Sequence, residues 1–316
     1  MNLLIGTVAF VFALAALGYL SVWSGLLSQQ SGEGLTDFAI AVALPLLLFR
    51  TMANADFTDS LPIALWLCYF SAAGLTWVIG YLMIIHLFGR DSRAGVVGGL
   101  SAGFSNLVLL GLPLIMGAYG DAGFKTLSLV VSIHMPVMIG VTVLLFALLG
   151  NSGSQKASPA AMLREIARTL FSNPLIIGIL SGLLWRTTGF SLPTLIERLI
   201  DALAGVAGPV ALFALGMGLN RHGIKGNIRP ALAVAALKVI LMPAIALIMA
   251  KSMGLTPISG KVAVVAASLP SGVRSYVIAS RFGSGEAPAA SATTIGTLMA
   301  ALSTAMWLAV AEWVFG

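Results

Sequence analysis

The sequence predicts an all-α polytopic membrane protein: ten transmembrane helices arranged as two inverted five-helix repeats, with the fourth and ninth helices broken. Three observations carry this prediction: the composition, ten apolar runs of spanning length, and paired interruptions in two of those runs. Of the 316 residues, 59% are hydrophobic and 9% are charged, whereas soluble domains carry about 25% charged residues. A soluble fold built from this chain would have too few polar residues to cover its surface.

A transmembrane helix needs about 20 predominantly apolar residues. The longest connector between apolar runs, 150–169, opens Gly/Ser-rich and closes with Arg164, Glu165 and Arg168, which predicts a linker followed by a short interfacial helix. The first run has no basic flank, so we interpret it as a span and not as a cleaved signal peptide. The ten predicted spans are 3–22, 34–52, 61–88, 94–118, 122–149, 170–189, 195–219, 229–253, 260–282 and 287–315.

The positive charges predict the orientation. The chain carries a net charge of +6, but its lysines and arginines are spread over short loops, which is typical of topology control and not of a nucleic-acid patch. Nine of them fall in the odd-numbered loops and six in the even-numbered loops. This bias places the odd loops, including 150–169, in the cytoplasm and both termini outside. The single cysteine, Cys68, excludes an intrachain disulfide.

Ten spans divided by one long linker predict a repeat. Because each half has an odd number of spans, the halves must have opposite orientations. Similar segments support this: "LPLLLFRT" at 44–51 matches "GPVALFAL" at 208–215, pairing Pro45 with Pro209. "IMGAYG" closes span 4 and "IASRFG" closes span 9 at nearly the same offset. We therefore predict a first repeat over 1–149, a cytoplasmic linker with an interfacial helix over 150–169, and a second, inverted repeat over 170–316.

Spans 4 and 9 carry interruptions near their centres. Proline removes a backbone donor and clashes with the preceding turn, and irregular backbone at membrane depth is tolerated only inside protein or beside a watery cavity. Proline kinks that bind nothing are also common, but paired interruptions in corresponding spans indicate the substrate site of a transporter. The expected binding residues are Ser105, Asn106, Pro270, Ser271, Gly272, Arg274 and His134, and the residues expected to break or shape helices are Gly111, Pro113, Pro45 and Pro209.

The ionisable residues within the spans leave alternatives open. Arg274 would suit a carboxylate, since an intramembrane arginine marks a substrate or ion path by default, but it could instead pair with Asp37 or Asp201. His134 could relay protons or be a hydrogen-bonded core histidine. Lys238 could bind substrate or have a structural role. The spans hold no run of acids, so we expect no carboxylate cage for sodium, no metal and no cofactor.

At the motif level the chain resembles the auxin efflux carrier family. "SNLVLLGLPLIMGAYG" resembles the span-4 signature of that family and "LPSGVRSYVIASRFG" its span-9 signature; "LPLLLFR", "NPLIIGILSGLLW" and "ALFALGMGL" are also similar to bacterial members. The resemblance implies two inverted repeats, with spans 4 and 9 crossing in a mobile transport domain that moves against a scaffold of spans 1, 2, 6 and 7. It also gives Asn106 the place of the span-4 asparagine and Pro270 that of the span-9 proline.

Family substrates are organic anions: auxins in plants and malonate or similar carboxylates in bacteria. Arg274 stands where many bacterial members have asparagine, which would favour a dicarboxylate. We thus expect a secondary carrier for small organic anions working by alternating access, a homodimer in a bacterial inner membrane, without nucleic acid as a partner. The alternatives are a sodium- or proton-coupled bile-acid-type carrier of similar architecture, a channel, and an intramembrane serine protease using "GFSN" at 103–106 with His134 as base.

Overall fold

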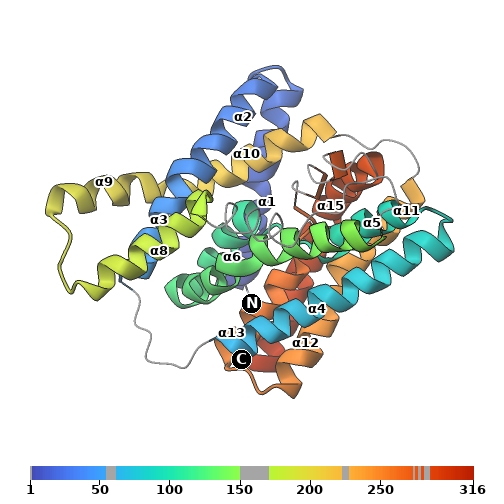
Figure 1. Ribbon diagram of the computed structural model, residues 1–316. Helices are drawn as coiled ribbons and strands as arrows, with labels where there is room; N and C mark the ends of the chain where they lie inside the picture. The colour runs from blue at the N-terminus through green and yellow to red at the C-terminus, as the bar shows by residue number, and fades with distance from the viewer. Residues whose placement is uncertain are drawn as a thin grey trace.

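The computed structural model describes residues 2–54, 62–149, 171–222, 228–272, 275–276, 279–280 and 285–316. Apart from one isolated β-bridge, every regular element in these ranges is a helix (Figure 1). The α-helices are α1 (Asn2–Trp23), α2 (Gln29–Phe38), α3 (Leu44–Ala53), α4 (Ile63–Leu82), α5 (Ser92–Gly103), α6 (Leu112–Leu149), α8 (Pro174–Thr187), α9 (Thr194–Gly205), α10 (Ala207–His222), α11 (Ile228–Ala236), α12 (Met242–Ser252), α13 (Pro257–Ser268) and α15 (Glu286–Phe315). There are also four π segments: η1 (Ala39–Ala43) joins α2 to α3, and η4 (Leu237–Leu241) joins α11 to α12. η2 (Met83–Leu87) extends α4, and η3 (Leu107–Gly111) leads into α6.

Seven of the described helical stretches are long and apolar enough to cross a membrane, and two more apolar helices, α8 and α13, are shorter. The longest stretch, Leu107–Phe146, contains 40 residues, and it changes direction at Gly120, whose φ of 60° and ψ of −154° are not helical. It therefore joins the second half of predicted span 4 to predicted span 5. These stretches confirm the prediction of an integral membrane protein with several spans. The predicted 150–169 linker lies outside the described residues.

Three of the π segments end two residues before a proline. Proline has no backbone N–H and its ring crowds the carbonyl four residues earlier, so the turn in front of it widens and the preceding residue bonds five residues back. Such π turns are often found at functional sites. The three bonds are Leu44 N to Ala39 O before Pro45, Leu112 N to Leu107 O before Pro113, and Met242 N to Leu237 O before Pro243.

The helices of predicted spans 1, 2, 6 and 7 pack closely in pairs. α1 lies along α10, and α3 lies along α8 and α9. Glycines permit this approach: a Cβ on Gly18 or Gly216 would collide with the backbone of the facing helix in the α1–α10 pair, and one on Gly178 or Gly182 would do so in the α3–α8 pair. Small residues at such contacts are typical of helix packing in membranes.

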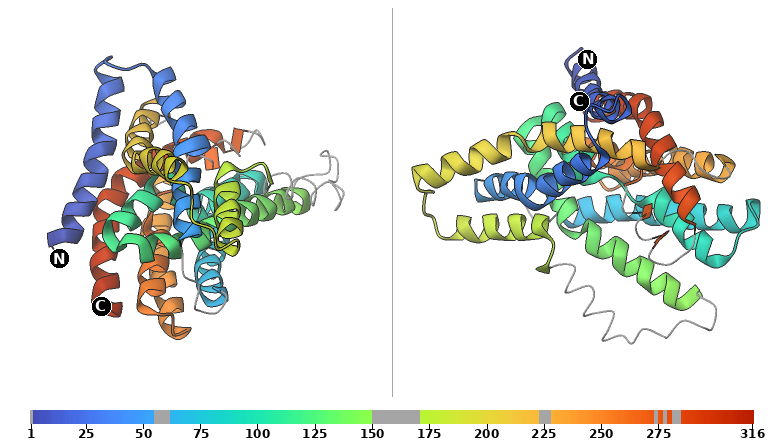
Figure 2. Two further views of the ribbon diagram at one scale, coloured as in Figure 1. Left: turned by 90° about the vertical axis from the view of Figure 1, so that its left-hand side faces the viewer. Right: turned by 90° about the horizontal axis from the view of Figure 1, so that it is seen from above.

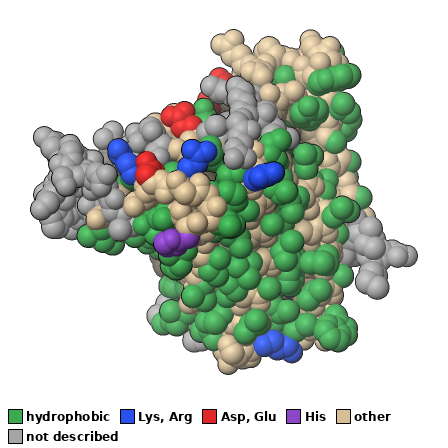
Figure 3. Space-filling view, turned by 90° about the vertical axis from the view of Figure 1, so that its right-hand side faces the viewer, with side chains coloured by type: hydrophobic (Ala, Val, Ile, Leu, Met, Phe, Trp, Pro, Cys, Tyr) green, Lys and Arg blue, Asp and Glu red, His purple; other side chains and the backbone are tan. Residues whose placement is uncertain are grey.

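The helices of the remaining spans pack together as a second group. α4 lies against α5, α12 and α13, and α15 lies against α11 and α13. The two views of Figure 2 agree that both chain ends lie close together. On the face drawn in Figure 3, apolar side chains cover the middle and lower parts, while most charged side chains gather in the upper part. This distribution fits a surface that contacts lipid between two polar ends.

Candidate functional site

Spans 4 and 9 are both interrupted, and the two interruptions lie against each other. α5 ends at Gly103 and η3 begins at Leu107, while α13 ends at Ser268. The backbone N–H of Asn106 donates to the carbonyl of Pro270 over 2.9 Å, and Ser105 and Ser271 form an antiparallel bridge. The two interruptions thus satisfy part of each other's backbone, as buried irregular backbone must.

Two glycines permit this contact: Gly272, predicted as a binding residue, and Gly111, predicted to shape the helix. A Cβ on Gly272 would lie 2.8 Å from Cε1 of Phe104, and one on Gly111 would lie 2.8 Å from Cδ1 of Leu269. The helix continues through Gly111 and Pro113, so the interruption of span 4 lies at 104–106, ahead of both. Pro45 lies in the first turn of α3, and Pro209 lies near the start of α10.

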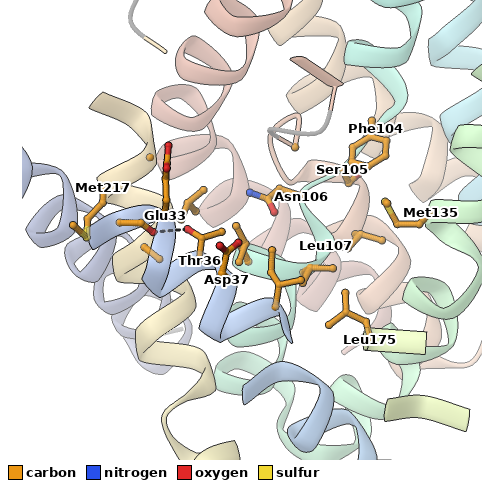
Figure 4. Close-up of a pocket in the computed structure, with 18 of the residues that line it drawn as sticks. Glu33, Thr36, Asp37, Phe104, Ser105, Asn106, Leu107, Met135, Leu175 and Met217 are labelled. Carbon is orange, nitrogen blue, oxygen red and sulfur yellow. Dashed lines mark hydrogen bonds between the residues drawn. The ribbon is translucent and has the colours of Figure 1, made fainter. Parts of the chain in front are cut away.

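A cavity of about 560 Å³ opens beside the crossing. Its walls come from α2 and η1, the interruption of span 4, α6 and α10 (Figure 4). Four of the predicted binding residues line it: Ser105, Asn106, His134 and Gly272. Pro270 and Ser271 are buried and are not part of its wall, and Arg274 lies outside the described residues.

Asn106 presents an unused amide to this cavity. Its side chain projects from the crossing toward α2 (Figure 4), and the residue is 7% exposed. Its backbone groups are occupied, since the N–H donates to Pro270 and the carbonyl accepts from Gly111 N over 3.0 Å. Within the described ranges, however, the side-chain amide has no hydrogen bond. It can therefore donate two hydrogen bonds and accept two from a bound molecule.

His134 lines the same cavity from α6. The residue is 3% exposed, and its ring centroid lies 4.7 Å from that of Phe104, 5.8 Å from Tyr69 and 6.4 Å from Phe70. Among the described residues, nothing hydrogen-bonds to its buried Nε2. Since buried polar atoms are normally paired, this nitrogen is available to a ligand.

The hydroxyl of Ser105 is fixed from behind the cavity. The hydroxyl of Tyr69, which is fully buried on α4, donates to Ser105 Oγ over 2.8 Å. A serine nucleophile requires a hydrogen bond to its base, and Nε2 of His134 makes none within the described chain. The geometry thus gives Ser105 a positioned hydroxyl without the partner that hydrolysis requires.

The sequence reasoning did not identify the polar residues of α2 as part of the site. Glu33, Thr36 and Asp37 line the cavity opposite Asn106 (Figure 4). Span 2 was expected from residue 34, but its helix begins at Gln29, because the side chain of Ser28 accepts a hydrogen bond from Ser31 N. The signal was the polar stretch "QQSGE" at 29–33, which a hydropathy criterion assigns to a loop.

The acids proposed as partners of Arg274 have different surroundings. Asp201 accepts from Arg50 Nη1 over 3.0 Å, whereas Asp37 is exposed at the cavity. Within the described part of the chain, no three His, Cys, Asp or Glu residues are grouped as a metal site would need.

Comparisons with known proteins identify the family of this chain. Residues 3–308 match the family model described as membrane transport protein. The "Putative malonate transporter" of Rhizobium meliloti is 29% identical over 93% of this chain and 91% of its own length. Auxin efflux carrier component 8 of Arabidopsis thaliana is 25% identical over 84% and 86% of the two chains, and the uncharacterized transporter YfdV of Escherichia coli is 24% identical over 98% of each. The chain therefore belongs to the membrane transport protein family that includes the auxin efflux carriers, and it is a transporter and not an enzyme.

Proposed function

We propose that this protein is a secondary active carrier for small organic anions, and that its substrate site is the cavity beside the crossing of spans 4 and 9. The unused amide of Asn106, facing that cavity from the interruption of span 4, is the observation that carries the proposal. In this proposal the chain crosses the membrane ten times as two inverted repeats, 1–149 and 170–316, with 150–169 as the linker.

The helix that follows Asn106 suits an anion. η3 and α6 run on from Leu107 without interruption as far as Gly120, so the N-terminal end of a helix lies at the crossing. Helix N-termini carry partial positive charge and free N–H groups, which favour anionic ligands. Asn106 at this end can donate to a carboxylate, and His134 Nε2 offers a further polar contact.

A second cavity supports alternating access. It has a volume of about 260 Å³ and lies farther along the same helices. On span 4 the first cavity is lined by 104–109 and the second by Pro113, Met116 and Gly117. Between these stretches lie Leu110 and Leu112, both fully buried. A carrier needs such an apolar barrier between its two approaches, whereas an open channel does not.

The substrate class rests on chemistry and on one relative. A relative named as a malonate transporter, together with Arg274 in span 9, favours a small dicarboxylate such as malonate. Arg274 can form two parallel hydrogen bonds with a carboxylate. The cavity volume is ample for such a ligand.

One observation supports a second candidate, a sodium- or proton-coupled carrier of similar architecture. Glu33 and Asp37 place two carboxylates on the cavity wall, one helical turn apart. Oxygen ligands of this kind suit hard cations. Uptake into proteoliposomes tests this candidate: accumulation of malonate that follows an imposed sodium or proton gradient would support ion coupling, whereas exchange against internal malonate that is insensitive to both gradients would contradict it.

Saturable counterflow tests the proposed function itself. Proteoliposomes loaded with unlabelled malonate should accumulate external labelled malonate transiently, and this exchange should saturate. Linear, non-saturating entry without counterflow would contradict a carrier.

The charge bias further leads us to propose an inner-membrane orientation with both termini outside. Impermeant thiol reagent applied to intact cells should label Gly316→Cys and spare Ser154→Cys in a Cys68→Ala background. The reverse pattern would overturn the orientation.

A further inference from the structure

Lys238 is a fully buried lysine beside the crossing that the proposed site does not yet use. It lies in η4, and its side chain has no exposure to solvent. Its Nζ donates to the carbonyl of Ala267 over 2.6 Å and to Sδ of Met242 over 3.1 Å. Neither acceptor carries a charge. Burying a charge without a partner is costly, so the balance of charge around Lys238 needs an explanation.

The carbonyl that Lys238 contacts belongs to the end of the helix before the interruption. Ala267 precedes Ser268, the last residue of α13. The final carbonyls of a helix lack partners within it and carry partial negative charge, which favours a cation there. Lys238 therefore stabilises the half-helix that leads into the crossing.

No described carboxylate completes this interaction. Of the ionisable groups on helices packed against η4, Lys261 and Glu312 pair with each other over 2.8 Å, and Lys251 donates to Val314 O. The others on those helices are Cys68, Tyr69, Tyr81, Arg93, Arg229 and Glu286, and none of them is paired with Lys238 in the described chain. Within the described residues only partial backbone charge faces Lys238, so its charged form lacks a counter-charge there.

The ammonium is joined to the cavity by a short stretch of backbone. Three residues after Ala267, the carbonyl of Pro270 accepts the N–H of Asn106, the residue whose side chain faces the cavity. Charges inside a protein act over longer distances than in water, because the effective dielectric constant is lower. A negative charge bound beside Asn106 would thus stabilise the charge on Lys238, and the reverse.

We propose that Lys238 is the counter-charge that makes this site select anions: a specificity-determining residue that contacts the end of α13 and not the ligand. The inference rests on the proposed function and deepens it, because it assigns the preference for charged ligands to a residue outside the cavity wall. The charge on Lys238 raises the affinity for a ligand with two negative charges more than the affinity for a ligand with one. It does not change the affinity for a neutral ligand of the same shape.

Three ligands of nearly equal size test this: malonate, its monoamide malonamate and its diamide malonamide, titrated calorimetrically into the purified protein. Lys238→Gln keeps a donor for the carbonyl of Ala267 but removes the charge. Lys251→Gln is the matched control, because Lys251 also donates to a carbonyl near a helix end, that of Val314, but at an exposed position. At an effective dielectric constant of about 20, the interaction of two buried charges exceeds thermal energy over several ångströms, so loss of the charge should weaken binding about tenfold per ligand charge.

The expected result is graded. Lys238→Gln should weaken malonate most, malonamate less and malonamide not at all, while Lys251→Gln should match the wild type with all three. A purely structural role would weaken all three ligands by the same factor, and this result, or an unchanged charge preference, would overturn the inference. Should the wild type bind none of the three, the proposed function would fail for this substrate class, so the two failures are distinguishable.

A second variant and a measurement on the wild type keep the test decisive if Lys238→Gln does not fold. Lys238→Met is a second uncharged variant whose side chain fills much of the same buried volume, and the same graded loss is expected for it. If neither variant folds, the wild type supplies the test: a preference set by buried charge should persist in 0.5 M sodium chloride, since buried charges are little screened. Loss of the preference in salt would assign it to exposed charges and overturn the inference.

Discussion

The interruptions of spans 4 and 9 meet at one point but present different chemistry. Span 4 presents side chains, because Ser105 and Asn106 line the cavity. Among its described residues, span 9 presents mainly backbone: Pro270 and Ser271 are buried behind the wall, the carbonyl of Pro270 accepts the N–H of Asn106, and Gly272 lines the cavity. The difference teaches that two interrupted segments that meet can have different parts in a site, one supplying side-chain hydrogen bonds and the other supplying backbone support.

The largest expected effect concerns charge on the span-9 side. If Arg274 contacts a substrate carboxylate, Arg274→Ala should cost about 2–5 kcal/mol of binding free energy, as does truncation of a buried charge pair. Arg274→Lys should restore only part, because lysine keeps the charge but not the planar fork. Calorimetric titration with malonate measures both.

The control for Arg274 is Arg198→Ala, which removes an exposed arginine from α9. A structural role for Arg274 makes the opposite prediction: unaltered affinity for malonate together with a lower melting temperature of the ligand-free protein. That pair of results would remove Arg274 from the substrate site.

The next largest effect is the loss of stability when alanine replaces either glycine of the crossing. Gly272→Ala should destabilise the ligand-free protein by about 1–3 kcal/mol, the usual cost of overpacking, because the new Cβ meets the ring of Phe104, which is itself packed on His134. Gly111→Ala should cost less, since its Cβ meets only the terminal methyl of Leu269. Thermal unfolding of the two variants gives the order, and an equal or reversed order would show that the span-9 side has room to move.

The smallest effect concerns the support of Ser105. Tyr69→Phe removes the hydroxyl that donates to Ser105 Oγ and should cost about 0.5–1.5 kcal/mol of stability, the net contribution of a typical hydrogen bond. A double-mutant cycle with Ser105→Ala measures the coupling. Additive effects would mean that the hydroxyl pair contributes nothing to the crossing.

The sequence predicted much of the fold because its signals are local. Hydropathy located the apolar helices, and proline with small polar residues marked both interruptions. The first half of α2, 29–33, was missed because its residues, among them Glu33, are too polar for a hydropathy criterion, although Glu33 lines the cavity. The predicted start of span 2, residue 34, therefore lies after the observed start of its helix, Gln29.

Contacts between distant segments had no local signal. Tyr69 reaches Ser105 across 36 residues, Lys238 reaches Ala267 across 29, and Arg50 reaches Asp201 across 151. Nothing near Lys238 in the sequence distinguishes a lysine that stabilises a helix end from one that binds substrate. The contact between Lys238 and the end of α13 comes from the packing of η4 on α13, which the sequence does not reveal.

Binding of malonate to the wild type and to Asn106→Ala tests the central claim most directly, because Asn106 is the polar side chain that the crossing itself places in the cavity. Hydrogen bonds to charged groups contribute about 1.5–3 kcal/mol, so Asn106→Ala should raise the Kd about 10- to 150-fold with little change in the melting temperature of the ligand-free protein. Asn54→Ala, at an exposed asparagine outside both cavities, should leave the Kd unchanged. An unaltered Kd in folded Asn106→Ala would contradict the placement of the substrate site at the crossing.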